Sequence, residues 1–354
     1  NSCLDYIPVL TFDNIGIEYS RKEERLQRLS FLKKNERRIE MGKELFVTIE
    51  STFTLQGTLT IPTYYSETYP VIMLIGGTGK ENRDGNTGRL QLNLYKELAD
   101  YFTSLGFAVL RYDKRGTHKS KGNYYKAGVT DFIDDAALWI RFLKDHPQID
   151  PKRVIIAGHS EGALLAPAVY VRESVAGLIL LAGAAEPSKL LLERQIDKVA
   201  NELEIASGFR GCLSKMLKIP QHMRKQNEVL VKKVQHSTKA VIWIKGTKVN
   251  AKWLREQLQY NVVAYLEQVS CPVLAITGDS DIQVPPEHAK LIASYVNGEA
   301  EWHIIPNMNH ILRNYEHKHT MIRLMKEYKG LMDKSIEEEL LHVMKGWLKK
   351  HYLS

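Results

Sequence analysis

The stretch Val154-Ile155-Ile156-Ala157-Gly158-His159-Ser160-Glu161-Gly162 says most about the fold of this 354-residue chain. Its first four residues are apolar, which is typical of a buried strand, and residues 161–171 have the apolar spacing of a helix. Between the two lies the pattern Gly-x-Ser-x-Gly, which occurs at sharp strand-to-helix turns that hold a serine hydroxyl clear of a sheet. The stretch therefore predicts an α/β fold with Ser160 as a nucleophile at a nucleophile elbow.

Short apolar runs of the same kind recur along the chain, with helical stretches between them. The strand-like runs are 71–75, 108–112, 154–157, 176–181, 273–277 and 302–305, and the helical stretches are 90–105, 132–144, 161–171, 287–295 and 335–350. Thr130 is the expected N-cap of the second helix, and residues 335–338 predict a capping box for the last. Runs that are apolar on both faces suit the buried strands of a parallel sheet. The alternation predicts a mostly parallel, doubly wound sheet, and residues 45–61, with Gln56-Gly57 near their middle, predict an antiparallel hairpin.

Composition divides the chain into three parts. Residues 1–45 are polar and rich in charge, and we expect a peripheral N-terminal segment there. Residues 46–186 and 271–354 carry the strand–helix alternation and form the expected core. Residues 187–270 are helical in pattern but broken by glycine and proline. We expect them to form a helical cap inserted over the carboxyl edge of the sheet.

The net charge of +8 belongs to the inserted part. Residues 187–262 contain 15 Lys and Arg against 6 Asp and Glu, whereas the rest of the chain has 34 basic and 35 acidic residues. A positive cap over a serine site would attract anionic substrates. Lys and Arg also occupy the solvated faces of amphipathic helices, and this interpretation is favoured.

His310 and Asp281 are the expected partners of Ser160 in a catalytic triad. A serine hydroxyl needs a base, and His310 lies in the loop after the run 302–305. The acid that orients this base should come from the loop after the preceding strand, where Asp279 and Asp281 compete. Asp281 is preferred because its place a few residues past the strand can reach the next loop, whereas Asp279 suits a turn. The chain order Ser…Asp…His is the one that this architecture requires.

Two backbone N–H groups are expected to form an oxyanion hole. One belongs to Glu161, the residue after the nucleophile, and the other to Thr78, in the loop Gly76-Gly77-Thr78-Gly79 after the run 71–75. The side chain of His159 is expected to point away from the site into packing. Three aromatic residues of the inserted part are expected in its core rather than in a pocket: Trp243, Trp253 and Tyr260.

Several classes of protein and site are not indicated by the sequence. It contains no phosphate loop, Rossmann glycine fingerprint or zinc-ligand spacing, so we expect no cofactor and no metal. No apolar run reaches the roughly 18 residues that cross a bilayer, and no nucleic-acid recognition module accompanies the basic residues. The expected partner is a small-molecule acyl substrate. Three scattered cysteines favour a cytoplasmic protein, and a secreted form stays open because the chain begins at Asn1.

Further motifs make the chain resemble bacterial esterases of the α/β-hydrolase superfamily that are related to dienelactone hydrolases and serine aminopeptidases. The resemblance covers roughly residues 46–352, and beyond the elbow its motifs are Arg83-Asp84-Gly85-Asn86, Tyr112-Asp113-Lys114-Arg115-Gly116, Gly278-x-x-Asp281-x-Gln283-Val284-Pro285 and Asn309-His310. It implies an α/β-hydrolase fold in which Asp84, Asp113 and Arg115 brace the oxyanion loop and the site rim. The family usually has His-Gly in that loop, where this chain has Gly76-Gly77, and the backbone donors are expected to survive the change.

Motifs and resemblance together predict a carboxylesterase-like serine hydrolase. Ser160 would attack esters of small to medium acyl chains and form an acyl-enzyme, without a cofactor. An acyl thioesterase or an aminopeptidase would use the same triad. A non-catalytic binding protein on the same fold is the alternative of another class, and it is disfavoured because Ser160, Asp281 and His310 are all present.

Overall fold

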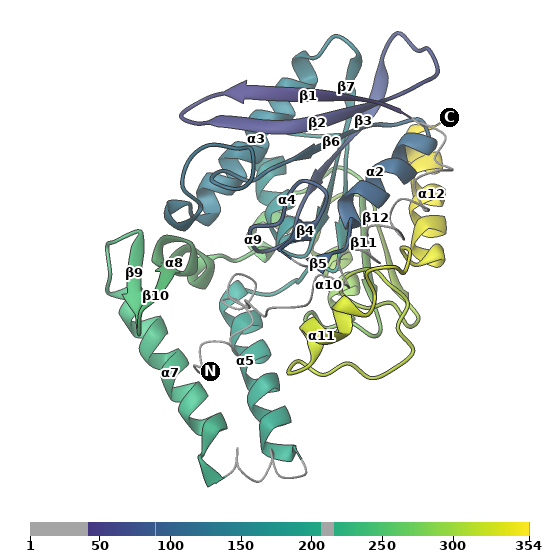
Figure 1. The fold of residues 1–354 in the computed structure, drawn as a ribbon. Helices are drawn as coiled ribbons and strands as arrows, with labels where there is room; N and C mark the ends of the chain where they lie inside the picture. Colours follow the sequence, from purple (N-terminus) through teal and green to yellow (C-terminus); the bar gives the residue numbers. More distant parts are fainter. Residues whose placement is uncertain (1–41, 89, 207–215, 354) are drawn as a thin grey trace, which may run out of the picture.

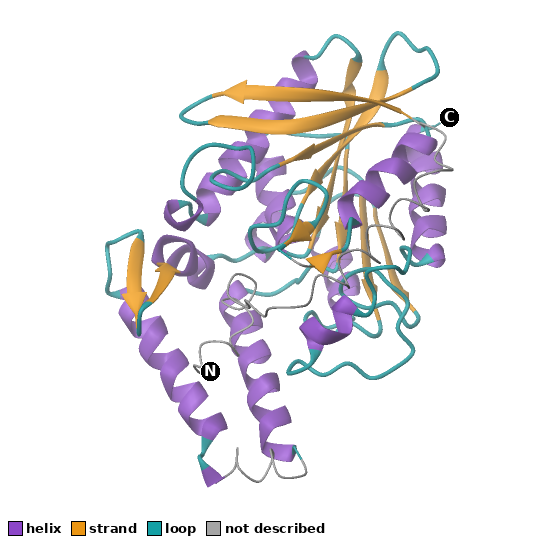
Figure 2. Ribbon diagram, viewed as in Figure 1, coloured by secondary structure: helices purple, strands orange, loops and turns teal. Residues whose placement is uncertain are grey.

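An eight-stranded sheet forms the centre of the computed structural model, which describes residues 42–88, 90–206 and 216–353 (Figures 1 and 2). Its strand order is β1-β2-β6-β3-β7-β8-β11-β12, antiparallel at β1 and β2 and parallel from β6 to β12. This confirms the predicted mostly parallel sheet. The strands are β1 Gly42–Glu50, β2 Thr54–Pro62, β3 Tyr69–Ile75, β6 Ala108–Tyr112, β7 Ile149–His159, β8 Gly177–Leu181, β11 Val273–Gly278 and β12 Ala300–Ile305.

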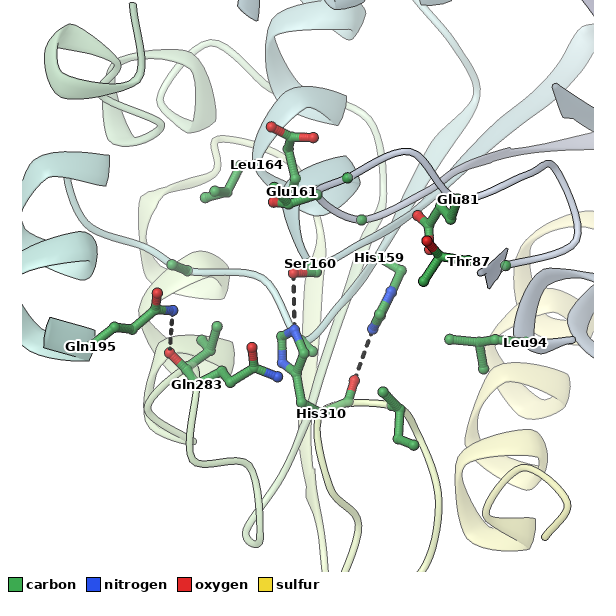
Figure 3. A pocket seen from close by; sticks show the side chains of 18 of the residues that line it. Glu81, Thr87, Leu94, His159, Ser160, Glu161, Leu164, Gln195, Gln283 and His310 are labelled. Carbon is green, nitrogen blue, oxygen red and sulfur yellow. Dashed lines mark hydrogen bonds between the residues drawn. The ribbon is translucent and has the colours of Figure 1, made fainter. Parts of the chain in front are cut away.

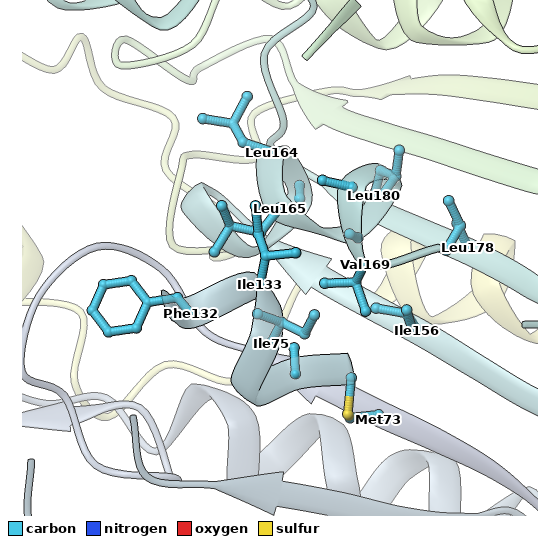
Figure 4. Close-up of a cluster of buried hydrophobic side chains, with 14 of the residues drawn as sticks. Met73, Ile75, Phe132, Ile133, Ile156, Leu164, Leu165, Val169, Leu178 and Leu180 are labelled. Carbon is cyan, nitrogen blue, oxygen red and sulfur yellow. The ribbon is translucent and has the colours of Figure 1, made fainter. Parts of the chain in front are cut away.

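Helices cover both faces of the sheet. One face carries α3 (Val129–Asp145), α4 (Glu161–Arg172) and α10 (His288–Tyr295), and the other carries α2 (Leu94–Ser104), α11 (Leu324–Lys329) and α12 (Glu338–Tyr352). Strand β3 shows why the sheet needs both layers, because Met73 and Ile75 belong to one apolar cluster while Ile72 and Leu74 belong to the other. Figure 4 shows the first cluster, where α3 and α4 pack on the strands. Burying one such side chain contributes roughly 1.5–3 kcal/mol.

The order of the strands places the functional site. The chain passes from β3 to β6 on one side and then returns to β7 on the other side of β3. The loops after β3 and β7 therefore diverge at the carboxyl ends of two neighbouring strands. Ligands of open α/β sheets bind at this kind of switch point.

Residues 187–270 leave the sheet after β8 and return before β11 (Figure 1). Their helices are α5 Ser188–Ile205, α7 Ile219–Gln235, α8 Ala251–Gln259 and α9 Val263–Leu266. The long helices α5 and α7 pack together through a small cluster of their own that includes Val199 and Met223. A hairpin of β9 (Val241–Ile244) and β10 (Thr247–Asn250) interrupts the helices, which the helical pattern did not predict.

Several predicted boundaries are wrong by a few residues. The helix expected from Leu90 begins at Leu94, because β5 (Leu90–Gln91) pairs with β4 (Asn86–Thr87). Helix α3 has Gly128 and not Thr130 as its N-cap, and the Gly128 amide donates to Asp131 at 2.7 Å. Helix α12 begins at Glu338 after an N-cap at Glu337, so the capping box expected at Ser335 is wrong.

The predicted N-terminal hairpin is present as β1 and β2. Its turn spans residues 51–53, while Gln56 and Gly57 lie within β2. Of the expected segment 1–45, residues 1–41 lie outside the described residues and the remainder belongs to β1. Among the described residues, no helix combines the length and the apolar composition that a membrane crossing requires.

Candidate active site

Ser160 occupies the turn between β7 and α4 with backbone angles of φ 54° and ψ −115°. A positive φ is costly for a residue that carries a side chain, so the surroundings must hold it. The Ser160 amide donates to the Leu181 carbonyl of β8 at 2.9 Å. A Cβ atom on Gly162 would lie 2.0 Å from the Ile75 carbonyl oxygen, and one on Gly158 would lie 2.3 Å from the Gly162 carbonyl oxygen. The two glycines therefore permit the tight contact that positions the serine.

The structure brings Ser160, His310 and Asp281 together at the carboxyl edge of the sheet. His310 Nε2 lies 2.9 Å from Ser160 Oγ (Figure 3). On the other side of the ring, His310 Nδ1 lies 2.7 Å from Asp281 Oδ2. If Nδ1 donates to the carboxylate, Nε2 presents its lone pair to the serine hydroxyl. This is the arrangement that activates a serine for nucleophilic attack.

The two competing aspartates have different surroundings. The Asp281 side chain is fully buried, and its Oδ1 accepts from the amides of Gln283 at 2.8 Å and Val284 at 3.0 Å. Asp279 is exposed, and its Oδ1 accepts from the Asn307 amide at 2.7 Å. Asp279 therefore connects the loop after β11 to the loop after β12. It does not bond the backbone of its own turn, in contrast to what the sequence suggested. Only Asp281 reaches His310.

The loop after β3 faces the serine. Gly77 lies so close that a Cβ atom on it would be 3.4 Å from Ser160 Cβ. The Gly77 amide already donates to the Tyr95 hydroxyl at 2.7 Å. The Gly77 amide is therefore already engaged in a hydrogen bond. Thr78 and Glu161 both line the pocket beside Ser160.

The Glu161 side chain makes a buried cluster that the sequence did not predict. Its Oε2 lies 3.0 Å from Lys114 Nζ, and its Oε1 accepts from Trp253 Nε1 at 2.8 Å and Gln257 Nε2 at 3.2 Å. Lys114 Nζ also donates to the Gly77 carbonyl. One carboxylate therefore links helix α8 of the inserted segment, the oxyanion loop and the serine turn.

The pocket has mostly apolar walls on both sides of Ser160 and a volume of about 130 Å³. Figure 3 shows Leu164 and Leu94 on opposite sides of the serine, with Gln195 and Gln283 at one end. Further apolar lining residues are Leu90, Leu92, Leu191, Leu192, Trp253, Val284 and Ile311. Of the described residues of the segment 187–270, those that line this pocket include no Lys or Arg.

His159 is not the packing residue that the sequence suggested. It is buried and lines the pocket, its Nε2 lies 2.8 Å from the His310 carbonyl oxygen, and its Nδ1 lies 3.1 Å from the Tyr95 hydroxyl. Burial, aided by the nearby His310, lowers the pKa of His159 to about 3. Tyr95 also contacts Glu81 Oε1 at 2.9 Å. Burial raises the pKa of Glu81, and burial and Glu81 raise that of Tyr95.

The residues expected to brace the site form ion pairs around it. Asp113 binds Arg83 with a contact of 2.6 Å, and it also accepts from the Arg83 amide at 2.9 Å. Arg115 reaches Asp135 at 2.5 Å, and Asp84 pairs with Arg111. These pairs fasten the segment that follows the oxyanion loop to the end of β6, and the loop after β6 to α3.

The aromatic residues of the inserted segment divide differently from the expectation. Trp253 belongs to the buried apolar cluster, as expected, and also lines the pocket. Trp243 is 64% exposed on the β9–β10 hairpin and is not a core residue. Tyr260 is buried and donates to the Leu164 carbonyl at 2.7 Å. His303 lies on the edge strand β12, half-buried, 2.7 Å from Glu301. Within the described residues, no cluster of His, Cys, Asp and Glu has the geometry of a metal site.

Comparison with known proteins places these features in a family context. The profile of the serine aminopeptidase S33 family matches residues 91–316. Esterase EstD of Thermotoga maritima is 26% identical over 292 residues, which are 82% of this chain and 65% of the esterase. This chain therefore spans just under two thirds of that relative.

Solved structures share the fold. Est1E of Butyrivibrio proteoclasticus, determined with ferulic acid bound, superimposes with a TM-score of 0.53 at 18% identity, over 81% of this chain and 97% of that one. The α/β-hydrolase GrgF of Penicillium sp. sh18 gives a TM-score of 0.55 at 16% identity, over 88% of this chain and all of that one (100%). At such identities the likeness concerns the fold alone.

Proposed function

The chain belongs to the serine aminopeptidase S33 family of the α/β-hydrolase superfamily, and from this premise we propose that it is a serine hydrolase that cleaves carboxylic esters of small to medium acyl chains. The observation that carries the proposal is that the side chains of Ser160, His310 and Asp281 are linked by hydrogen bonds in a mostly apolar pocket. The Asp281 carboxylate would orient the imidazole and stabilise its cationic form. No cofactor is needed for this chemistry.

Acylation follows from the geometry. Ser160 Oγ attacks the ester carbonyl carbon while its proton passes to His310 Nε2, and the carbonyl oxygen becomes an oxyanion. The amides of Thr78 and Glu161 would donate to that oxygen, where one such donor is worth about 3 kcal/mol of barrier. His310 then gives its proton to the departing alcohol, and the acyl group stays on Ser160.

Deacylation repeats these steps with water as the nucleophile. His310 takes a proton from the water, which attacks the acyl carbon through the same oxyanion site. The proton returns to Ser160 Oγ as the acid leaves. The free serine is then ready for another ester.

The mostly apolar walls of the pocket favour substrates with neutral acyl and alcohol groups. Apolar side chains flank Ser160 on two sides, and the segment 187–270 contributes Leu191, Leu192 and Trp253 to them. We infer that this segment is a cap between two core parts, 46–186 and 271–354, and that it limits the acyl length. A cavity of about 130 Å³ suits short chains better than long ones.

A peptide substrate is the second candidate, because the family is described as a serine aminopeptidase. An aminopeptidase must bind a free ammonium group, and a free carboxylate in the pocket would serve. The two pocket acids are both engaged, Glu161 by Lys114 and Glu81 by Tyr95. Esters, and thioesters with them, therefore fit the site better than peptides with a free amine.

Hydrolysis of p-nitrophenyl esters from acetate to decanoate tests the proposal. Wild type should turn over the short esters, Ser160→Ala should lose the activity, and Ser294→Ala, a change on the exposed face of α10, should keep it. Aminoacyl p-nitroanilides and acyl thioesters assayed alongside would identify the two alternatives. A folded wild type that hydrolyses none of these and does not react with a fluorophosphonate would leave the binding-protein interpretation.

A further inference from the structure

A chain of hydrogen bonds runs beside the triad and joins four parts of the fold. The Gly77 amide of the oxyanion loop donates to the Tyr95 hydroxyl at 2.7 Å, and that hydroxyl lies 2.9 Å from Glu81 Oε1 and 3.1 Å from His159 Nδ1. His159 Nε2 lies 2.8 Å from the His310 carbonyl oxygen. The chain therefore extends from the oxyanion loop, through α2 and the end of β7, to the backbone of the expected base.

The number of protons fixes the direction of every bond. A carbonyl oxygen only accepts, so His159 Nε2 must carry a proton. His159 is held neutral, because burial lowers its pKa to about 3, and its Nδ1 is then a bare acceptor. The single hydroxyl proton of Tyr95 must therefore point to His159. The contact between Tyr95 and Glu81 then needs a proton from Glu81.

The charges around Glu81 agree with a protonated carboxyl. Burial raises the pKa of Glu81, and the neighbouring Glu161 raises it further, while Lys114 and the contacts from Tyr95 and Gly77 oppose the shift. Lys114 already forms its ion pair with Glu161 at 3.0 Å. Within the described part of the chain, no Lys, Arg or His side chain forms an ion pair with Glu81. A second ionised acid beside Glu161 would lack a counter-ion of its own.

We propose that neutral Glu81, Tyr95 and His159 form an ordered relay of hydrogen bonds that positions the His310 loop against the oxyanion loop. These are positioning residues, and the inference rests on the proposed function. His310 would be held at two places, its imidazole by Asp281 and its carbonyl by His159. The Tyr95 hydroxyl holds the peptide group between Gly76 and Gly77, and Lys114 holds the next one, which leads to Thr78, at the Gly77 carbonyl.

The glycine at position 76 belongs to the same arrangement. A Cβ atom there would lie 2.6 Å from Glu81 Oε1 and 2.9 Å from Tyr95 Cε2. The relay therefore fills the space beside the oxyanion loop that any side chain at position 76 would need. The Glu81–Tyr95 contact in this position therefore requires a glycine at position 76.

Tyr95→Phe tests the relay, because it removes the shared hydroxyl and keeps the ring. Its matched control is Tyr101→Phe on the same helix, which removes a hydroxyl that donates to the Leu341 carbonyl far from the site. We expect kcat per titrated active site to fall about 10- to 100-fold in Tyr95→Phe, with KM within about twofold, and to stay unchanged in Tyr101→Phe. An unchanged kcat in Tyr95→Phe would reduce the relay to a structural feature and overturn the proposal.

A pair of His159 variants keeps the proposal testable if Tyr95→Phe does not fold. His159→Phe loses both ring nitrogens, whereas the amide of His159→Gln can still donate to the His310 carbonyl. We expect the Phe variant to lose activity as Tyr95→Phe does, and the Gln variant to recover part of it. Equal activity in the two variants would contradict a positioning bond to His310.

Infrared spectroscopy tests the proton order directly. The difference spectrum between wild type and Glu81→Gln at neutral pH should show the carbonyl stretch of a protonated carboxyl, shifted in D2O. A carboxylate band in its place would show that Glu81 is ionised and would overturn the assigned order.

The rate of phosphonylation of Ser160 by a fluorophosphonate separates this inference from the proposed function. A wild type that reacts fast but cleaves no ester would refute the esterase and leave the relay testable by the same reaction. Equal phosphonylation rates in wild type and Tyr95→Phe would refute the relay alone.

Discussion

At the scale of single residues, the two aspartates after β11 show how position decides chemistry. Asp279 and Asp281 are two residues apart, yet one is exposed and bonded to the Asn307 amide while the other is buried against His310. Two backbone amides donate to the Asp281 carboxylate and hold it in one orientation. This carboxylate can therefore hold the imidazole in one tautomer.

Asp281→Asn should lower kcat by about 10³- to 10⁴-fold, because an amide cannot act as a pure acceptor and would allow the wrong tautomer. Asp279→Asn is the matched change two residues away, and it should keep kcat within about twofold. Ester hydrolysis per titrated active site measures both. Similar losses in the two variants would show that Asp281 is not the orienting acid.

His159 makes stability depend on pH in a definite direction. Its pKa is about 3 in the folded protein and 6.5 in an unfolded chain, so between these values only the unfolded state binds the proton. The contribution of His159 to the free energy of unfolding is therefore constant above pH 6.5. Between pH 6.5 and about pH 3 it falls by about 1.4 kcal/mol for each pH unit. Urea unfolding at pH 7 and pH 5 should show wild type losing about 2 kcal/mol more than His159→Gln. Parallel losses would mean that the buried ring is not neutral.

At the scale of elements, the Glu161 cluster joins the inserted segment to the core. Trp253 and Gln257 of α8 meet the first residue of α4 through one carboxylate, which Lys114 of the loop after β6 neutralises. The side chains of Lys114 and Glu161 are 6% and 2% exposed, so water cannot replace a missing partner. The position of α8 over the pocket thus depends on a buried ion pair.

Lys114→Met should destabilise the protein by about 3–5 kcal/mol, because it leaves the Glu161 carboxylate buried without its cation. The control is Lys189→Met on α5, whose pair with Glu193 is half-exposed and should contribute less than about 1 kcal/mol. Urea unfolding at neutral pH gives both values. A loss in Lys114→Met as small as that of the control would show that the buried contact between Lys114 and Glu161 does not stabilise the fold.

Elements with a strong apolar pattern could be predicted from the sequence, whereas those made by tertiary contact could not. Each buried parallel strand was found within a few residues, except that β7 is longer than its apolar run. The short pairs β4–β5 and β9–β10 lack apolar alternation and depend on their partners. The same holds for the site. Ser160 and His310 lie in local motifs, but Tyr95 lies in an ordinary amphipathic helix and meets His159 only when α2 packs on the sheet.

At the scale of the whole molecule, the basic segment and the serine pocket are adjacent but chemically separate. The part of 187–270 that lines the pocket contributes apolar and uncharged polar groups, among them Leu191, Gln195 and Trp253. Described lysines such as Lys232, Lys233 and Lys239 are exposed. The excess positive charge therefore lies mainly on the solvated surface of the segment.

Replacing Lys232, Lys233 and Lys239 by Gln should leave kcat/KM unchanged for p-nitrophenyl butyrate. We expect the same for mono-p-nitrophenyl succinate, an anionic ester of the same length, because exposed charges are screened beyond about 10 Å at 0.1 M salt. Measuring kcat/KM for both esters in low and in physiological salt checks this. If the triple variant lost activity on the anionic ester alone, and salt abolished the difference, the basic segment would be a device for steering anionic substrates to Ser160. The mostly apolar walls of the pocket favour the result in which kcat/KM is unchanged for both esters.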